Sequence, residues 1–132
     1  MAMIDCSKPE IEAGARAMTC VEAVNKTSSN SGNKMMVLTW ADEDGNTLKD
    51  YFIYEMANGK TPRQSKFRSL FYAMERPDPV FDPESCNDEG HYEEFEGLTL
   101  MVNIKVQSPI DKITGAVGYP ESNIAGYLRG EE

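Results

Sequence analysis

The stretch 34–54 holds the residues best suited to binding chemistry, because lysines and aromatic rings occur close together in it. Nucleic-acid bases stack on aromatic rings, and lysine ammonium groups pair with phosphates. In a strand, Lys49 and Tyr51 lie on one face, and Phe52 and Tyr54 lie on the opposite face. We therefore predict a surface for single-stranded nucleic acid. Its candidate residues are Lys26, Lys34, Trp40, Lys49, Tyr51 and Lys105.

The same rings have a second explanation as core residues. A small barrel must bury several large side chains, so either face of this stretch can point inward. Trp40 fits the core as well as it fits a surface. Tyr51 is the better surface candidate, because Lys49 beside it indicates an open face.

Catalytic and metal sites find little support. His91 is the only histidine, so a Ser-His-Asp triad would have to use it as the base. Cys86 and His91 lack a second pair of zinc ligands at suitable spacing. Asp42 and Asp44 resemble the start of a calcium loop, but no glutamate closes it. With neither a P-loop nor a dinucleotide-binding fingerprint present, we predict no enzyme, no cofactor and no metal.

The charge is strongly acidic but unevenly distributed. The formal net charge is −9, and residues 75–96 hold nine acids and one arginine. The rest of the chain is close to neutral, so a local basic face is compatible with it. Long-range attraction to nucleic acid would be weak, and binding would depend on short-range contacts. An alternative follows from the same acids: a DNA-mimicking protein that inhibits a host DNA-binding enzyme.

Length and composition predict one domain, residues 1–132, with an acidic loop over 77–96. No apolar run approaches the length of about 20 residues that spans a bilayer. Residues 1–12 lack the pattern of a secretory signal. Three widely spaced cysteines, Cys6, Cys20 and Cys86, favour a reducing compartment over a disulfide framework. We therefore expect a cytoplasmic protein that does not bind membranes.

The most secure local structure is a hairpin over residues 34–56. Two strand-like runs, 34–41 and 47–56, flank a turn that contains Asp44-Gly45, a strong hairpin signal. A strand is also expected at 14–24, followed by a polar loop at 25–33.

A helix is expected over residues 61–75. Thr61 can cap it, Pro62 suits the first turn, and Gln64 completes a capping box. Basic side chains on the opposite face are normally solvated. The apolar stripe consists of Phe67, Leu70, Phe71 and Met74, and the basic residues are Arg63, Lys66 and Arg68.

Two more strands are expected, a regular one at 97–107 and a weaker one at 116–128. Five strands with a helix between the third and fourth give the order of an OB-type Greek-key barrel. We therefore predict a mainly β protein of this class. An SH3-like barrel or an open sandwich has the same strand count.

Residues 26–36, KTSSNSGNKMM, run directly into the second expected strand. This stretch resembles the K-T-S-x-x-G-N-x-M signature of a phage family of small OB-fold proteins that are predicted to bind single-stranded DNA. Later segments follow the layout of that family: DYF at 50–52, FEGL at 95–98 and Gly115 in the last turn. The resemblance covers residues 16–127.

The resemblance implies an accessory protein of phage replication or recombination, located in the host cytoplasm. Single-stranded DNA would be its ligand, and replication or recombination proteins would be its partners. Self-association is a further option that the sequence leaves open.

Overall fold

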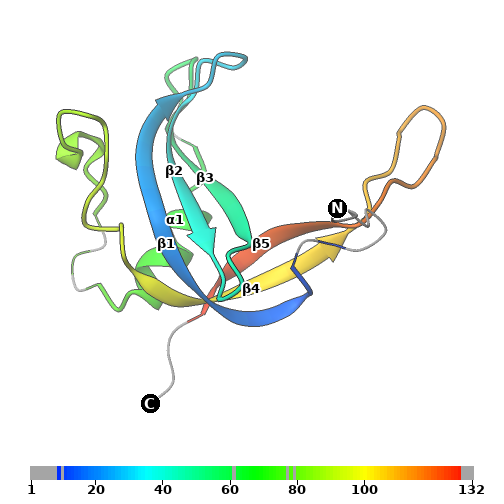
Figure 1. Ribbon diagram of the computed structural model, residues 1–132. Coiled ribbons are helices and arrows are strands. Elements are labelled where there is room, and N and C mark those ends of the chain that lie inside the picture. Colours follow the sequence, from blue (N-terminus) through cyan, green and yellow to red (C-terminus); the bar gives the residue numbers. More distant parts are fainter. Residues whose placement is uncertain (1–8, 10, 61, 77, 79, 129–132) are drawn as a thin grey trace.

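The computed structural model describes residues 9, 11–60, 62–76, 78 and 80–128 (Figure 1). Within them, no helix is long and apolar enough to cross a membrane. These described residues form five strands, one α-helix and a short 3₁₀ helix. They are β1 (Gly14–Thr27), β2 (Lys34–Ala41), β3 (Thr47–Glu55), α1 (Ser65–Ala73), η1 (Pro83–Ser85), β4 (Thr99–Gln107) and β5 (Glu121–Leu128).

All five strands form one antiparallel sheet in the order β3-β2-β1-β4-β5. The long central strand β1 pairs with β2 through its second half and with β4 through its first half. Thr19 is the point of exchange, because it lies opposite both Ala41 and Thr99. The register with β2 shifts between Cys20 and Glu22, and such an irregularity increases local bending. Figure 1 shows the resulting curve of β1.

The two outer strands of the sheet approach each other through side chains. The hydroxyl of Tyr127 on β5 donates a hydrogen bond of 2.7 Å to Asp50 on β3. Ser69 of α1 accepts a hydrogen bond of 3.1 Å from the backbone N–H of Tyr127. Among the described residues, no backbone ladder joins β3 to β5. The fold is therefore mainly β, as predicted, and barrel-like without closure of the sheet.

The core lies inside this curved sheet and under α1. Every second residue of β2, Met36, Leu38 and Trp40, belongs to the core cluster, as the period of a strand requires. Phe67 of α1 lies against Phe52 of β3, with ring centroids 5.2 Å apart. The side chains that are almost completely buried are Ile11, Met18, Cys20, Met36, Leu38, Trp40, Phe52, Leu70, Tyr92, Phe95 and Val102.

The β2–β3 hairpin is confirmed, with its turn at the predicted place. Gly45 has a φ of +84°, a conformation that glycine adopts without strain. The Asp42 carboxylate accepts hydrogen bonds from the N–H groups of Asp44 and Asn46, at 3.0 and 2.9 Å. It also pairs with Arg16 at 3.4 Å. Burial by itself would raise the pKa of Asp42, but the hydrogen bonds from Asn46 and Asp44 together outweigh burial and hold this pKa below its usual value.

Three predicted boundaries are wrong by three or more residues. Strand β1 continues to Thr27, because its last residues pair with the start of β2. Helix α1 begins at Ser65, not at residue 61, and Gln64 precedes it without a side-chain cap. Thr61 itself lies outside the described residues. Strand β5 begins at Glu121, five residues later than predicted, because a turn occupies the segment before it.

The acid-rich residues 75–96, called the acidic segment below, contribute to the core and do not form only a surface loop. Its backbone continues along β1: Asn25 donates to the Gly90 carbonyl at 2.7 Å, and Tyr92 donates to the Ala23 carbonyl at 2.8 Å. Tyr92 and Phe95 are completely buried. The acidic residues of this segment therefore lie beside buried aromatic residues that belong to the core.

Candidate nucleic-acid interface

Tyr51 lies on the outer face of the sheet, as predicted. Its side chain is 48% exposed, whereas Phe52, the next residue, is completely buried. Across the sheet, Tyr51 lies opposite Val37, and Lys49 lies opposite Thr39. Both Tyr51 and Lys49 are on the solvent side of the edge strand β3. An aromatic ring and an ammonium group are thus available together.

Lys66 at the start of α1 and Arg63 just before it lie beside Tyr51. The Lys66 ammonium donates hydrogen bonds of 2.7 Å to Asp50 and 3.1 Å to the Tyr51 carbonyl. Arg63, Lys66 and Tyr51 line one hollow of about 260 Å³. Arg63 makes no ion pair with any described residue, so its charge faces solvent. The sequence placed these two basic residues on a solvated helix face and gave no sign of the contact with β3.

Trp40 does not belong to this surface. Its side chain is completely buried, and its indole N–H donates a hydrogen bond of 3.1 Å to the Tyr127 hydroxyl. That hydroxyl in turn donates to Asp50, which also holds Lys66. Burial, with Asp50 close by, raises the pKa of Tyr127 far above its usual value, so the hydroxyl remains a donor. Trp40 is therefore a core residue and cannot stack on a base in this conformation.

Lys26 and Lys34 lie near each other at one end of the sheet. Lys34 pairs with Thr27, and Lys26 pairs with Met35 of β2. Both lysines are exposed, but Lys34 also forms an ion pair of 3.5 Å with Glu55. Its charge is therefore partly offset, and Lys26 is the freer cation of the two.

Lys105 is remote from the other candidates. It is exposed on β4, where it lies opposite Asn123 of β5. Its neighbour Ile104 pairs with Gly14, the first residue of β1, whereas Lys34 pairs with the last. The length of β1 thus separates Lys105 from Lys34. The structure brings Lys49 and Tyr51 together, and it leaves Lys105 apart.

The segment that carries the signature forms a tight turn between β1 and β2. Ser28 donates to the Asn33 carbonyl, and Gly32 donates to the Ser28 carbonyl, each at 2.9 Å. The Asn33 side chain accepts a hydrogen bond of 3.0 Å from the Ala57 N–H beyond β3. Three residues, not two, separate Ser28 from Gly32 in this chain, so the match to the signature is looser than its letters suggest.

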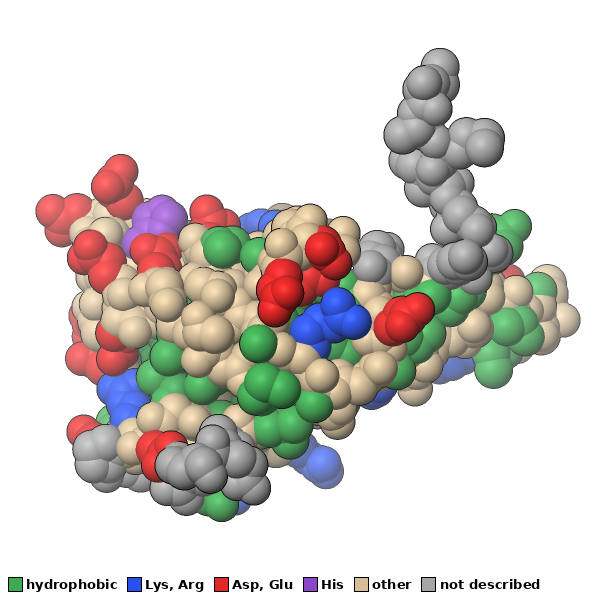
Figure 2. Space-filling model, turned by 60° about the horizontal axis from the view of Figure 1, so that its bottom comes forward, with side chains coloured by type: hydrophobic (Ala, Val, Ile, Leu, Met, Phe, Trp, Pro, Cys, Tyr) green, Lys and Arg blue, Asp and Glu red, His purple; other side chains and the backbone are tan. Residues whose placement is uncertain are grey.

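The acidic segment forms a different surface. Figure 2 shows acidic side chains gathered at the end of the molecule where the loop after η1 lies. Glu96 is the exception, because its carboxylate faces inward and accepts hydrogen bonds from the Ala23 N–H at 3.0 Å and from His91 at 2.8 Å. The hydrogen bond with Glu96 raises the pKa of His91, and the bond from Ala23 lowers that of Glu96. Four exposed acids of this surface are Asp88, Glu89, Glu93 and Glu94.

Within the part of the chain that the structure describes, no three His, Cys, Asp or Glu side chains cluster closely enough to hold a metal ion. No family model matches the chain, and a search of curated proteins found no similar sequence.

Proposed function

We propose that this protein binds single-stranded DNA through the outer face of β3 and the start of α1. One observation carries the proposal: Tyr51 offers an exposed ring with Lys49 on the same face of β3, and Tyr51 lines one hollow with Arg63 and with Lys66, whose charge is partly offset by Asp50. Stacking on a ring is tolerant of sequence, because every base has a π face. The cations beside the ring suit the phosphates on either side of a stacked base.

The arrangement of the strands supports an OB-type barrel. The sheet order, the helix between β3 and β4, and the approach of Tyr127 to Asp50 are those expected of such a barrel. Strands two and three of an OB barrel form its usual platform for oligonucleotides. Tyr51 and Lys49 lie on the third strand here. A role in phage replication or recombination extends this proposal and rests on the resemblance of residues 26–36.

Binding of this kind is expected to depend more on stacking than on charge. Each stacked base contributes about 1–3 kcal/mol. Each phosphate contact on a single strand contributes a slope of about −0.7 to the salt dependence. Few cations surround Tyr51, and the net charge of the chain is −9. A shallow salt slope with a large share from stacking therefore follows.

The deciding experiment measures the affinity of a labelled oligo-dT by fluorescence anisotropy. We expect Tyr51→Ala to weaken binding by about 1–3 kcal/mol and to leave the salt slope almost unchanged. Tyr72→Ala is the matched control, because Tyr72 is another exposed tyrosine and lies outside the hollow that Tyr51 lines. Equal losses in both variants, or a Tyr51→Ala variant that binds like wild type, would contradict the proposal.

The cations provide a second measurement on the same complex. Lys49→Ala and Arg63→Ala should each weaken binding to all sequences alike and flatten the salt slope. Lys105→Ala should leave the slope unchanged, because Lys105 lies at the other end of β1. If Lys105→Ala weakened binding more than Lys49→Ala, the DNA would instead lie on β4.

The acidic surface supports a second candidate, a mimic of DNA that inhibits a DNA-binding enzyme. The supporting observation is the set of exposed carboxylates at one end of the molecule (Figure 2). Asp88→Asn with Glu89→Gln separates the two candidates, because neither exposed residue belongs to the core. The change should strengthen oligonucleotide binding slightly at low salt if DNA is the ligand. Weaker inhibition of a DNA-binding enzyme would instead support the mimic.

A further inference from the structure

The hairpin between β4 and β5 extends beyond the body of the protein. We call residues 108–120 the arm, and Figure 1 shows it projecting away from the other elements. Ile113 at its tip is 95% exposed. Large apolar side chains that are exposed together on a protein surface generally mark an interaction site. The arm carries four of them: Ile110, Ile113, Val117 and Tyr119.

The arm is ordered by its own hydrogen bonds. Asp111 donates to the Ala116 carbonyl at 2.9 Å, and Gly115 donates to the Asp111 carbonyl at 2.7 Å. The Asp111 carboxylate accepts the Ile113 N–H at 2.8 Å, and this bond lowers the pKa of Asp111. Ile113 is therefore held in a defined position. An ordered tip loses less conformational entropy on binding than a flexible one.

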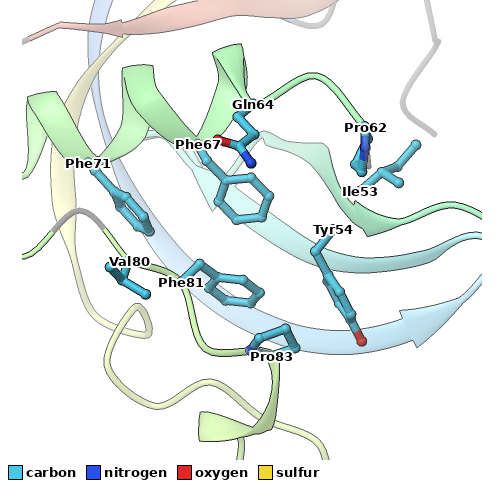
Figure 3. A pocket seen from close by; sticks show the side chains of 9 residues that line it. All are labelled: Ile53, Tyr54, Pro62, Gln64, Phe67, Phe71, Val80, Phe81 and Pro83. Carbon is cyan, nitrogen blue, oxygen red and sulfur yellow. The ribbon is translucent and has the colours of Figure 1, made fainter. Parts of the chain in front are cut away.

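An apolar groove lies on another part of the same molecule. Phe67 and Phe71 of α1 line it together with Val80 and Phe81 (Figure 3), and the rings of Phe67 and Phe81 pack against each other with centroids 4.9 Å apart. Tyr54 of β3 contributes to the side of the groove, which has a volume of about 290 Å³. An apolar cavity of about 150 Å³ accepts a benzene-sized group, so this groove has room for one or two aliphatic side chains.

We propose that the arm of one copy of this chain docks in the groove of a second copy. The tip supplies the apolar side chains, and the groove supplies an apolar site of matching size. Charge agrees with this pairing: Lys112 beside the tip is an exposed cation, and Glu84 beside the groove is an exposed acid. The only acid of the arm, Asp111, turns its carboxylate to the backbone of the turn.

The positions of the two surfaces determine the kind of assembly. The arm and the segment at 80–83 lie at opposite sides of the molecule in Figure 1, so the arm does not fill its own groove. Each copy then offers one arm and one groove to different neighbours. Such a heterologous contact builds open chains or rings and not only closed pairs. This inference does not depend on single-stranded DNA binding.

The test is sedimentation velocity of the purified full chain over a range of concentrations. We expect the average mass of the wild type to rise with concentration. Ile113→Asp and Val80→Asp should each weaken self-association by at least about tenfold, because each puts a charge into the apolar contact. Val21→Asp is the matched control, an exposed apolar residue outside both surfaces. A wild type that stays monomeric at every concentration overturns the inference.

Mixing the two variants tests the arm-in-groove arrangement directly. Ile113→Asp keeps an intact groove, and Val80→Asp keeps an intact arm. A 1:1 mixture should therefore give a complex of two chains and no larger species. Assembly of Val80→Asp like the wild type would overturn the groove as the docking site. Assembly that disappears with nuclease would show bridging by nucleic acid and would also overturn the inference.

Circular dichroism and thermal melting of each variant establish that it is folded. The wild-type measurement keeps the test decisive even if one variant does not fold. Ammonium sulfate gives an independent readout, because excluded salts strengthen apolar burial. The assembly should tighten with sulfate, and dissociation in sulfate would contradict an apolar contact.

Discussion

The two hairpins of the sheet have the same antiparallel pairing but differ in whether their apolar residues are buried. In the β2–β3 hairpin, Met36, Leu38 and Trp40 point into the core, and the turn closes on the buried side chain of Asp42. In the β4–β5 hairpin, Val102 and Ile104 are buried, but Ile110, Ile113, Val117 and Tyr119 of the arm are exposed. The first hairpin stabilises the fold, and the second carries apolar surface out into solvent.

The two hairpins show that the type of an apolar residue on a strand or turn does not determine whether it is buried. Burial depends on which other elements pack over that residue. Helix α1 and the acidic segment cover the inner face of the β2–β3 hairpin through Phe67 and Phe95. In the described residues, nothing covers Ile113. Substitutions in the two hairpins should therefore differ most in their effect on unfolding.

The largest effect should come from Trp40→Ala. Removing a fully buried tryptophan leaves a cavity and should lower the free energy of unfolding by about 3–5 kcal/mol. Ile113→Ala should change it by less than about 0.5 kcal/mol, because Ile113 is exposed. Urea unfolding at low protein concentration measures both values. Similar losses in the two variants would show that the arm packs on the body.

Tyr127→Phe should have the next largest effect. The change removes the hydroxyl that accepts from Trp40 and donates to Asp50, and it leaves two buried polar groups without that partner. A loss of about 1–3 kcal/mol in the free energy of unfolding follows. Tyr119→Phe is the control, because the arm exposes Tyr119. An unchanged Tyr127→Phe variant would mean that water replaces the hydroxyl.

The sequence predicted the parts of the fold that local patterns specify. The hairpin over 34–56 follows from two strand-like runs and Asp44-Gly45, and the outward position of Tyr51 follows from Lys49 on the same face. Trp40 was ambiguous for a physical reason. Both faces of β2 are apolar, with Met35 and Val37 on the outer face, so alternation alone does not identify the inner one.

Tertiary contacts decided the rest. Arg63 and Lys66 join Tyr51 only because the start of α1 lies against the edge of β3. Tyr92 and Phe95 are core residues inside an acid-rich segment, and their charged neighbours conceal them. Two aromatic residues three positions apart among acids were the available signal. The exposed arm was missed because Val117 and Tyr119 were assigned to a strand at 116–128, whereas β5 begins only at Glu121.

The smallest expected effect is the pH dependence of the contact between His91 and Glu96. Their hydrogen bond raises the pKa of His91 above its unfolded value of 6.5. The charged imidazolium therefore stabilises the fold fully below that value, and the stabilisation disappears as pH rises through the higher folded pKa. Glu96 stays ionised in this range, because its pKa is lowered, and it continues to hold the Ala23 N–H. The melting temperature should therefore fall slightly between about pH 6 and pH 8. His91→Gln should remove this dependence, and a wild-type melting temperature that rises over the same range would contradict the assignment.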